Sequence, residues 1–311
     1  MNTPVTSLLM AAALSAGSAA HAQSINSDGL QPEIFTLTVR ASVYAPSDVA
    51  MPVHVFKPRQ PQAGVGASGP WPVVIFSHGR AGNLAGRAAL KSPVHSYFEM
   101  VRYWQGKGYA VVAAIRPGYG ENTAHDPEDH GARWRGNMCT GPVNYGKTAG
   151  AAAYAIRTVR DWVVTQGWAN KDRMLLVGQS VGGLATVAAC AQNWPGVIGC
   201  VNFVGGAGGN PEDSPGKSCL ADQLGEELAS HGKSTTVPSM WLYSANDKFW
   251  GEQAPKDWYR AYVAVAKAAG QKAPSEFFAA PAVGDNGHTL QGSGGKIWMP
   301  VLDSWLKANG F

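Results

Sequence analysis

The stretch that decides the fold is MLLVGQSVGGLATVAA, residues 174–189. It begins as a continuous apolar run, which is typical of a buried strand, and it ends in small apolar residues, which are typical of a buried helix. Between the two lies Gly178-Gln179-Ser180-Val181-Gly182, a pattern that in this context predicts a sharp turn lifting a serine hydroxyl above the edge of a sheet. The backbone at such a serine is strained, and its neighbours two residues away must be small. The sequence therefore predicts a nucleophilic serine at position 180; the alternative is a glycine-rich turn with an ordinary serine.

Outside this stretch, apolar runs alternate with helical patterns along the chain. The first two runs alternate apolar and polar residues and predict an antiparallel pair, whereas the later ones are continuously apolar and predict a mostly parallel sheet covered on both faces. Right-handed crossovers make this one doubly wound α/β domain. The expected strands are 34–40, 53–57, 71–77, 109–115, 174–177, 199–204, 238–244 and 275–279, and the expected helices are 97–105, 145–166, 184–189, 258–269 and 296–308.

Two segments between these elements are unusually long, namely 116–143 and 205–236. Loops of more than about 15 residues inside a compact domain are usually functional. In sheets of this kind ligands bind at the carboxyl ends of the strands. We therefore expect both segments to lie at that edge of the sheet, next to the serine.

A serine hydroxyl becomes a good nucleophile only when a base removes its proton and a carboxylate orients that base. In this topology the order along the chain is serine, acid, histidine. Asp247 follows the apolar run 240–244, and His288 lies in a Gly/Asp/Asn turn after the last strand. We expect Asp247 to orient His288 and His288 to act as the base. Asp285 is the rival acid. The alternative for Asp247 is that it caps the N-terminus of the following helix, and the alternative for His288 is that it is a solvated loop residue.

Acyl transfer also requires hydrogen-bond donors aimed at the developing oxyanion. One expected donor is the backbone N–H of Val181, because free amides and the helix dipole at a helix N-terminus favour an anion. The second is expected from the loop after strand 71–77, where we select the backbone of Arg80. His78 in the same loop is expected to have a structural role. Three aromatic side chains, Tyr119, Trp134 and Trp250, are expected to line an apolar substrate cleft.

The composition limits the other partners of this chain. It has 311 residues, of which 45% are hydrophobic and 15% charged, so it can bury a large core. The formal net charge is only +4, and no basic run stands out. We therefore expect no nucleic-acid partner and no polybasic membrane anchor. We expect a monomer.

The N-terminus has the pattern of an export signal. Residues 7–20 are small and apolar, and Ala20-His21-Ala22 fits the small-residue cleavage site. The run is too short for a membrane-spanning helix, and residues 1–4 depart from the pattern because they carry no lysine or arginine. We expect a signal peptide at 1–22, a single domain at 23–311 and a periplasmic or secreted protein.

The chain has four cysteines, and an even number in an oxidising compartment predicts disulfides. Three pairings are possible. We favour Cys139–Cys219 across the two long loops and Cys190–Cys200 between a helix and the next strand. The alternative is that Cys190 is a small buried hydrophobic residue. The spacings do not resemble a zinc site, and we expect no metal.

Together these marks resemble the α/β-hydrolase superfamily, in particular secreted esterases and lipases of the dienelactone-hydrolase-like branch. The resemblance rests on the His78-Gly79 loop, the RPGYG turn at 116–120, the elbow at 178–183, Asp247 after a strand and Gly287-His288. It implies an eight-stranded, mostly parallel sheet with helices on both faces. It also implies a serine acyl-enzyme that hydrolyses carboxylic esters through a Ser-His-Asp triad without a metal or organic cofactor. We expect a small-molecule ester as the substrate, and a polymer ester is the alternative. Dienelactone hydrolases proper carry a cysteine nucleophile, so a serine at position 180 favours general ester hydrolysis.

Two other functions remain open. A serine peptidase of the prolyl-oligopeptidase kind resembles the same domain and shares the two glycines after the elbow. Such peptidases normally carry a propeller domain, for which 311 residues leave no room. An inactive α/β-hydrolase that only binds ligands is disfavoured by the presence of serine, acid and histidine candidates.

Overall fold

The computed structural model describes residues 30–58 and 69–311. The expected signal peptide at 1–22 lies outside the described residues. A central sheet of eight strands has the order β1-β2-β4-β3-β7-β8-β11-β12. β2 is antiparallel to both of its neighbours, and all other neighbouring pairs are parallel. The strands are β1 (Glu33–Val39), β2 (Val49–Phe56), β3 (Trp71–Ser77), β4 (Ala110–Ala114), β7 (Ala169–Gln179), β8 (Val197–Phe203), β11 (Ser239–Ser244) and β12 (Ser275–Ala280).

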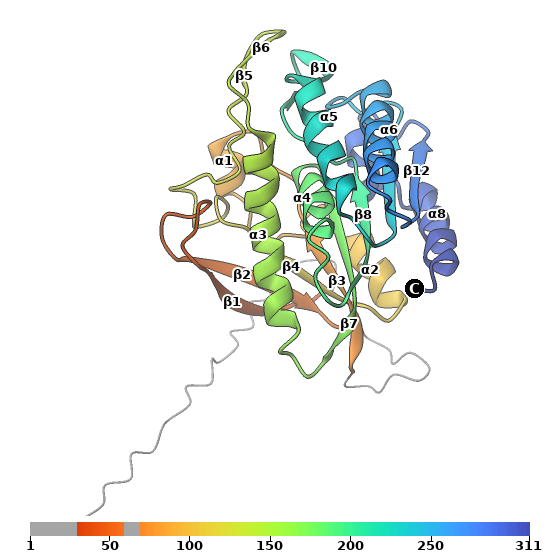
Figure 1. Ribbon diagram of the computed structural model, residues 1–311. Coiled ribbons are helices and arrows are strands. Elements are labelled where there is room, and N and C mark those ends of the chain that lie inside the picture. The colour runs from red at the N-terminus through yellow and green to blue at the C-terminus, as the bar shows by residue number, and fades with distance from the viewer. Residues whose placement is uncertain (1–29, 59–68) are drawn as a thin grey trace, which may run out of the picture.

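Helices cover both faces of this sheet (Figure 1). α3, α4, α5 and α6 pack side by side on one face, and α2 and α8 pack together on the other. The helices are α1 (Leu84–Ala88), α2 (Phe98–Gly106), α3 (Tyr145–Val163), α4 (Val181–Cys190), α5 (Ala221–Ser230), α6 (Gln253–Ala268), α7 (Leu290–Ser293) and α8 (Gly295–Ala308). The predicted doubly wound, mostly parallel, eight-stranded sheet is therefore confirmed.

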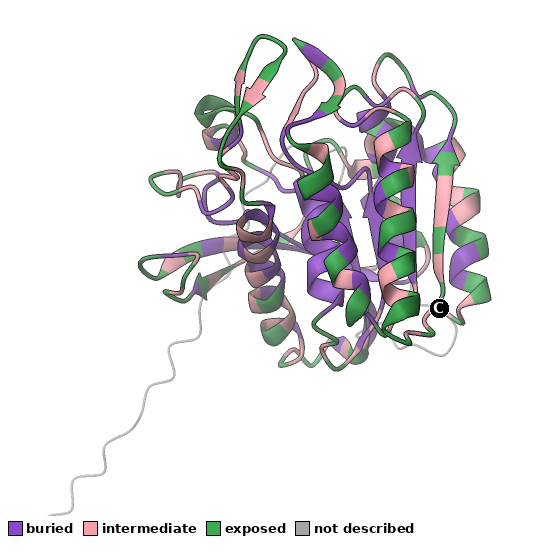
Figure 2. Ribbon diagram, turned by 45° about the horizontal axis from the view of Figure 1, so that its top comes forward, coloured by how far each residue is buried: buried purple, intermediate pink, exposed green. Residues whose placement is uncertain are grey.

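The central strands are buried on both faces, as their continuous apolar sequences require. Every residue of β3 and β4 is buried, and so are the last six residues of β7. Figure 2 shows these strands as a buried layer beneath helices whose outer faces are exposed. The edge strand β1 instead alternates between more and less exposed residues. Burial of the core thus fixes where the serine-bearing end of β7 lies.

α4 is buried along its whole length between β7, β8 and α3. Small residues make this possible, because α3 presents an alanine-rich face that includes Ala149, Ala152 and Ala155. Asn144 begins α3 by accepting a hydrogen bond from Lys147 N at 2.7 Å, which satisfies a free amide of the first turn. α3 therefore provides a fixed support beneath the elbow helix.

The two long loops contain more structure than the sequence indicated. The first holds the hairpin of β5 (Arg133–Arg135) and β6 (Met138–Thr140), and the second holds β9 (Gly209–Asn210), β10 (Ser214–Ser218) and α5. Both lie at the carboxyl edge of the parallel strands, as expected (Figure 1). α5 was not predicted because its sequence contains Gly225, which weakens a helix in isolation. In the fold this glycine lies against Trp258, where a Cβ atom would come within 2.7 Å of the ring.

Both favoured cysteine pairings are confirmed. Cys139–Cys219 joins the two long loops with a Cα–Cα distance of 5.5 Å, and Cys190–Cys200 joins the end of α4 to β8 with a distance of 6.5 Å. None of the helices in the described part of the chain is both long and apolar enough to cross a bilayer.

The elbow depends on two glycines that let α4 cross closely over neighbouring strands. A Cβ atom at Gly182 would lie 2.0 Å from Ser77 O and 2.5 Å from His78 O, and one at Gly178 would lie 2.0 Å from Gly182 O. These neighbours are main-chain atoms of β3, of the loop directly after it and of α4, so they cannot move aside without shifting the packed elements.

We predict that Gly182→Ala lowers the free energy of unfolding by about 3 kcal/mol, because overpacking against main-chain atoms cannot relax. Urea denaturation followed by circular dichroism measures this. Gly106→Ala at the end of α2 is the matched control, because its Cβ atom meets nothing within 4 Å, and it should stay within about 1 kcal/mol of the wild type. Equal stability of the two variants would contradict the close crossing.

Candidate active site

Ser180 lies between the end of β7 and the start of α4 in a strained conformation. Its φ is 56° and its ψ is −123°, which a residue with a side chain rarely adopts. Three backbone hydrogen bonds hold it there. Its N–H donates to Phe203 O at 3.0 Å, and its carbonyl accepts from Leu184 N at 3.0 Å and Gly206 N at 3.1 Å. The strain is thus imposed by the surrounding structure, as is common at functional sites.

His288 lies beside Asp247. Its Nδ1 is 3.0 Å from Asp247 Oδ2 and 3.2 Å from Oδ1, and the acid side chain is fully buried. Asp247 Oδ1 also accepts from the backbone N–H groups of Phe249 at 2.7 Å and Trp250 at 3.3 Å. Because a carboxylate that accepts these bonds has no proton to donate, His288 Nδ1 carries the hydrogen of this contact, and Nε2 is the ring nitrogen that the acid leaves available. The rival Asp285 is exposed and makes no such contact.

The loops that carry these two side chains are held to each other. Asn286 Oδ1 accepts from Lys248 N at 3.0 Å and from His288 N at 3.1 Å. Gly287 packs against the end of β11, where a Cβ atom would lie 2.5 Å from Ser244 Oγ. The Asp247–His288 pair is therefore fixed by backbone contacts on both sides.

Aromatic rings fix the orientation of the imidazole. The ring of Phe249 lies 4.0 Å from that of His288 between centroids, and Trp250 meets it edge-on at 5.4 Å. Trp250 is only 2% exposed, and its Nε1 donates to Val204 O at 2.8 Å. Trp250 also lines a cavity that borders Ser180, so its contact with substrate stays a prediction, and the structure adds that its ring packs against His288. Phe249, which the sequence analysis missed, is the more accessible of the two.

Ser180 and His288 line the same cavity of about 530 Å³, together with the loop of residues 78–81. The structure records no hydrogen bond between the serine hydroxyl and the imidazole. Both side chains are nearly buried, so the cavity is their shared opening. The structure brings the three predicted residues to one place, from the ends of β7 and β11 and from the short helix η2 (Gly287–Thr289).

Gln179, which precedes the serine, ties three parts of this site together. Its Oε1 accepts from Tyr97 Oη at 2.8 Å, and its Nε2 donates to His288 O at 3.2 Å. A Cβ atom at Gly79 would lie 2.2 Å from Gln179 Oε1 and 3.3 Å from Ser180 Cβ. The loop after β3 therefore rests directly on the elbow. The sequence offered no signal for Gln179, because its position in the elbow pattern accepts any residue.

The two amides expected to bind an oxyanion both lie beside Ser180. Val181 is the first residue of α4, where amide groups have no partner within the helix. Arg80 follows Gly79 in the loop and borders the serine. Across residues 30–58 and 69–311, neither N–H donates to a protein acceptor. Neither amide is thus taken up by another group of the described residues, and their binding of an oxyanion stays a prediction.

A buried ion pair holds this loop in place. Arg116 Nε is 2.6 Å from Glu128 Oε1, and the two side chains are 2% and 1% exposed. Arg116 also donates from Nη1 to His78 O at 2.7 Å and to Ser77 Oγ at 3.0 Å. Because water does not reach this guanidinium and carboxylate, each needs the other as its partner. The pair therefore holds Arg116 in place, and the hydrogen bonds of Arg116 hold the loop at residues 77–78.

His78 is part of the same support. Burial, together with the nearby charge of Arg116, lowers the pKa of His78 well below its usual value, so the ring is neutral. Its Nδ1–H donates to Gly79 O at 2.7 Å, and its Nε2 accepts from Arg116 N at 3.5 Å. Both ring nitrogens are engaged in holding the backbone.

Tyr119 does not line either of the cavities that border Ser180. It is 1% exposed, and its hydroxyl donates to Glu128 Oε2 at 2.6 Å. Its ring packs edge-on against His78 at 4.7 Å and lies 5.2 Å from the guanidinium of Arg116. The expectation of a substrate contact is therefore corrected. A tyrosine in a long loop gave no indication that a buried ion pair would need its hydroxyl.

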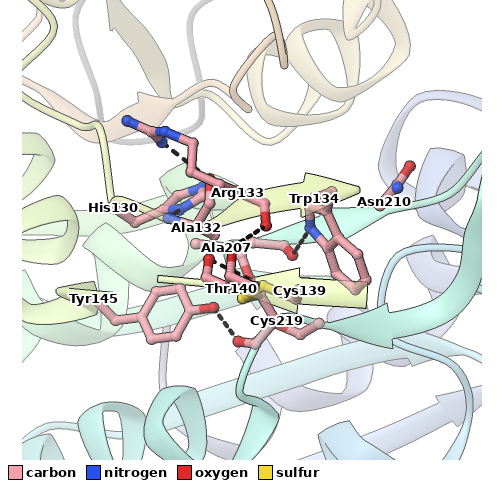
Figure 3. Close-up of a disulfide and its surroundings, with 12 residues drawn as sticks. His130, Ala132, Arg133, Trp134, Cys139, Thr140, Tyr145, Ala207, Asn210 and Cys219 are labelled. Carbon is pink, nitrogen blue, oxygen red and sulfur yellow. Dashed lines mark hydrogen bonds between the residues drawn. A yellow bond between two sulfur atoms is a disulfide. The ribbon is translucent and has the colours of Figure 1, made fainter. Parts of the chain in front are cut away.

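A second cavity of about 680 Å³ opens on the other side of Ser180. Trp134 lines it, as expected, from the β5–β6 hairpin, and its Nε1 donates to Gly208 O at 3.0 Å (Figure 3). The Cys139–Cys219 disulfide joins the same two segments, and Tyr145 Oη donates to Cys219 O beside it. The two long loops thus form one cross-linked wall of this cavity.

Among the described residues, no group of three or more His, Cys, Asp or Glu side chains is placed to hold a metal ion.

This architecture is the α/β-hydrolase fold, and solved structures share it. An esterase from Pyrococcus furiosus is 13% identical with a TM-score of 0.58, and the match covers 94% of this chain and 96% of the esterase. A Klebsiella pneumoniae protein provisionally named a dienelactone hydrolase is 18% identical with a TM-score of 0.51, covering 87% and 97%. A Pyrococcus horikoshii acylaminoacyl peptidase is 14% identical with a TM-score of 0.51 over 85% of this chain, which spans only 39% of the peptidase. The sequence matches no protein-family model and no curated protein.

We predict that Arg116→Met lowers the free energy of unfolding by about 3–5 kcal/mol, because it leaves the carboxylate of Glu128 buried without its partner. Thermal and urea unfolding measure the loss. Arg260→Met is the matched control, because Arg260 forms an exposed ion pair with Asp257 on α6, and it should cost no more than about 0.5 kcal/mol. A small and equal loss in both variants would show that the buried pair does not hold the loop.

We also predict that Cys139→Ala/Cys219→Ala speeds amide hydrogen exchange in residues 133–140 and costs about 4 kcal/mol of stability, because the cross-link closes a long loop. The cysteines are 80 residues apart in sequence. Hydrogen exchange with mass spectrometry provides the measurement.

The matched control is Cys190→Ala/Cys200→Ala, whose cysteines are 10 residues apart. It should cost about 3 kcal/mol and leave exchange in the hairpin unchanged. Protection of the hairpin that persists without Cys139 and Cys219 would mean that other contacts hold the wall.

Proposed function

We propose that this protein is a serine hydrolase that cleaves carboxylic esters through an acyl-enzyme. The observation that carries the proposal is the buried hydrogen bond between Asp247 and His288 Nδ1, which leaves Nε2 as the available ring nitrogen of a histidine that shares a cavity with the strained Ser180. This is the arrangement that a nucleophile, a base and an orienting acid require.

In the proposed reaction, His288 Nε2 accepts the Ser180 proton as the hydroxyl oxygen attacks the ester carbonyl. The amides of Val181 and Arg80 donate to the oxyanion of the tetrahedral intermediate. His288 then gives the proton to the departing alcohol. Water, activated by the same imidazole, attacks the acyl-enzyme and releases the acid. Asp247 holds the imidazole in one tautomer and stabilises its charged form throughout.

The comparisons favour an ester over a peptide as the substrate. The Pyrococcus furiosus esterase matches this chain over nearly its whole length, whereas the chain spans only 39% of the acylaminoacyl peptidase. Two cavities of a few hundred cubic ångströms suit a small molecule, since ligand sites usually measure about 300–1,000 Å³. We therefore propose a small-molecule ester as the substrate.

We also propose that the chain works outside the reducing cytoplasm as a monomer, after removal of residues 1–22. The two disulfides support an oxidising compartment, where such cross-links persist. The remaining support is the export-signal pattern of the N-terminal sequence.

The test is hydrolysis of 4-nitrophenyl acetate and butyrate by the full chain. Ser180→Ala should lower kcat by about 10⁴-fold or more, because it removes the nucleophile. Ser304→Ala is the matched control, because Ser304 is exposed on α8, away from both cavities, and it should match the wild type.

A peptide 4-nitroanilide tests the alternatives. Turnover of the anilide at a rate comparable to that of the esters would favour a peptidase. A wild type that turns over neither substrate, or a Ser180→Ala variant as active as the wild type, would overturn the proposal.

A further inference from the structure

Two cavities of different chemical character meet at Ser180. The one of about 530 Å³, which we name the His288 cavity, is lined by His288 and by Leu90, Pro93 and Tyr97. The one of about 680 Å³, which we name the hairpin cavity, is lined by Val181 and by residues of the two long loops. Ser180, Arg80 and Phe249 border both, whereas His288 borders only the first.

Because His288 borders only one cavity, the two cavities can be assigned to the alcohol and acyl groups of an ester, provided that the proposed function holds. In the second half of the acylation step the proton on His288 Nε2 passes to the leaving alcohol oxygen, so that oxygen must lie within hydrogen-bond reach of the imidazole. The alcohol group must then extend into the His288 cavity. The acyl group is bonded to Ser180 Oγ and then extends into the hairpin cavity, which Ser180 also borders.

The His288 cavity offers few free hydrogen-bonding groups. Leu90 and Pro93 form apolar wall, and the ring of Phe249 stands at the boundary. Two of the polar side chains here are engaged within the protein, since Tyr97 Oη donates to Gln179 and Ser293 Oγ donates to Thr289 O at 3.0 Å. His95 and Ser96 also line this cavity, but both residues are exposed to solvent. An apolar alcohol group gains from burial there, and a polar one would lose its water without replacement.

The hairpin cavity is rich in charge and hydrogen-bonding groups. Arg80 binds Asp126 through two hydrogen bonds of 2.8 and 2.5 Å, and Arg87 lies 3.2 Å from the same carboxylate. Two guanidinium groups thus share one acid. The further charged or polar lining residues are Asn83, Asp129, His130, Arg133, Asn210 and Glu212.

These further residues leave the hairpin cavity polar. Arg133 is paired with Asp129 at 2.9 Å and remains more than half exposed, so its outer donors face solvent. Glu212 is exposed, where water screens its charge. Trp134 is the large apolar side chain of the hairpin wall, and its indole N–H is already bound to Gly208 O. An acyl group with its own hydroxyl or carbonyl oxygen would find hydrogen-bonding groups in this cavity.

We propose that the substrate is an ester that joins an apolar alcohol to a polar, hydrogen-bonding acyl group, with the alcohol in the His288 cavity and the acyl group in the hairpin cavity. The inference rests on the proposed function and adds to it the substrate class and its direction of binding.

Two isomeric esters test the direction. Benzyl 3-hydroxypropanoate has an apolar alcohol and a polar acyl group, and 2-hydroxyethyl phenylacetate has the reverse. Each kcat/KM is divided by the rate of alkaline hydrolysis of the same ester, so that intrinsic reactivity cancels. The wild type should prefer the benzyl ester by about tenfold or more, which is the discrimination that a pocket achieves for one well-placed group.

The wall of the His288 cavity provides the variant. Leu90→Ser should reduce this preference severalfold, because it places an unsatisfied hydroxyl where the benzyl ring packs. Leu84→Ser is the matched control, because Leu84 is 57% exposed and lines neither cavity, and it should keep the wild-type ratio. The ratio of two substrates on one preparation is independent of the fraction of folded enzyme.

The outcomes separate this inference from the proposed function. Hydrolysis of 4-nitrophenyl acetate that depends on Ser180, combined with equal turnover of the isomers or a preference for 2-hydroxyethyl phenylacetate, overturns the assignment of the cavities and leaves the esterase standing. A preference for the benzyl ester that Leu90→Ser does not reduce also overturns it. Absence of Ser180-dependent turnover of any ester overturns the proposed function itself.

Discussion

The backbone of three segments meets around Ser180 because no side chain stands between them. Gly178 lets the end of β7 approach α4, Gly182 lets α4 pass over the carbonyls of β3, and Gly79 lets the following loop rest on Gln179. These contacts are between main-chain atoms or against the side chain of Gln179, which is hydrogen-bonded through both its oxygen and its nitrogen. The three segments therefore have little freedom to shift relative to one another. The strained φ of Ser180 is the geometric result of these contacts. Everything that borders the serine, including both amides and both cavities, takes its position from this crossing.

The loop after β3 and the β5–β6 hairpin are held largely by charge and by covalent bonds. The Arg116–Glu128 pair fixes the first turn of the loop after β3, and Tyr119 and His78 complete its hydrogen bonds. On the opposite side a disulfide and the Trp134–Gly208 hydrogen bond fix the hairpin. Loops that carry function cannot bury much apolar surface, so polar and covalent links replace the core that holds the sheet. The site thus combines a rigid apolar base with separately fastened walls.

The sequence predicted those parts of the molecule whose cause is local. Continuous apolar runs predicted the central strands because burial on both faces requires them, and the glycines around Ser180 predicted the elbow because only they fit the turn. Asp247 and His288 were predicted from their places after strands, and the structure puts them in contact. Tyr119 was misassigned because its role depends on a partner elsewhere in the loop. A sequence shows that a tyrosine is present, but not that the carboxylate of Glu128 accepts a hydrogen bond from its hydroxyl.

The cross-link between Cys139 and Cys219 has a consequence for how this protein can change. The two segments that it joins leave the sheet after different strands, yet they face one cavity as a single body. A longer or shorter hairpin would pull the partner loop with it, so neither can be remodelled alone. Anyone who wished to graft this wall onto another hydrolase scaffold would have to transplant both insertions together, at matching heights above the host sheet.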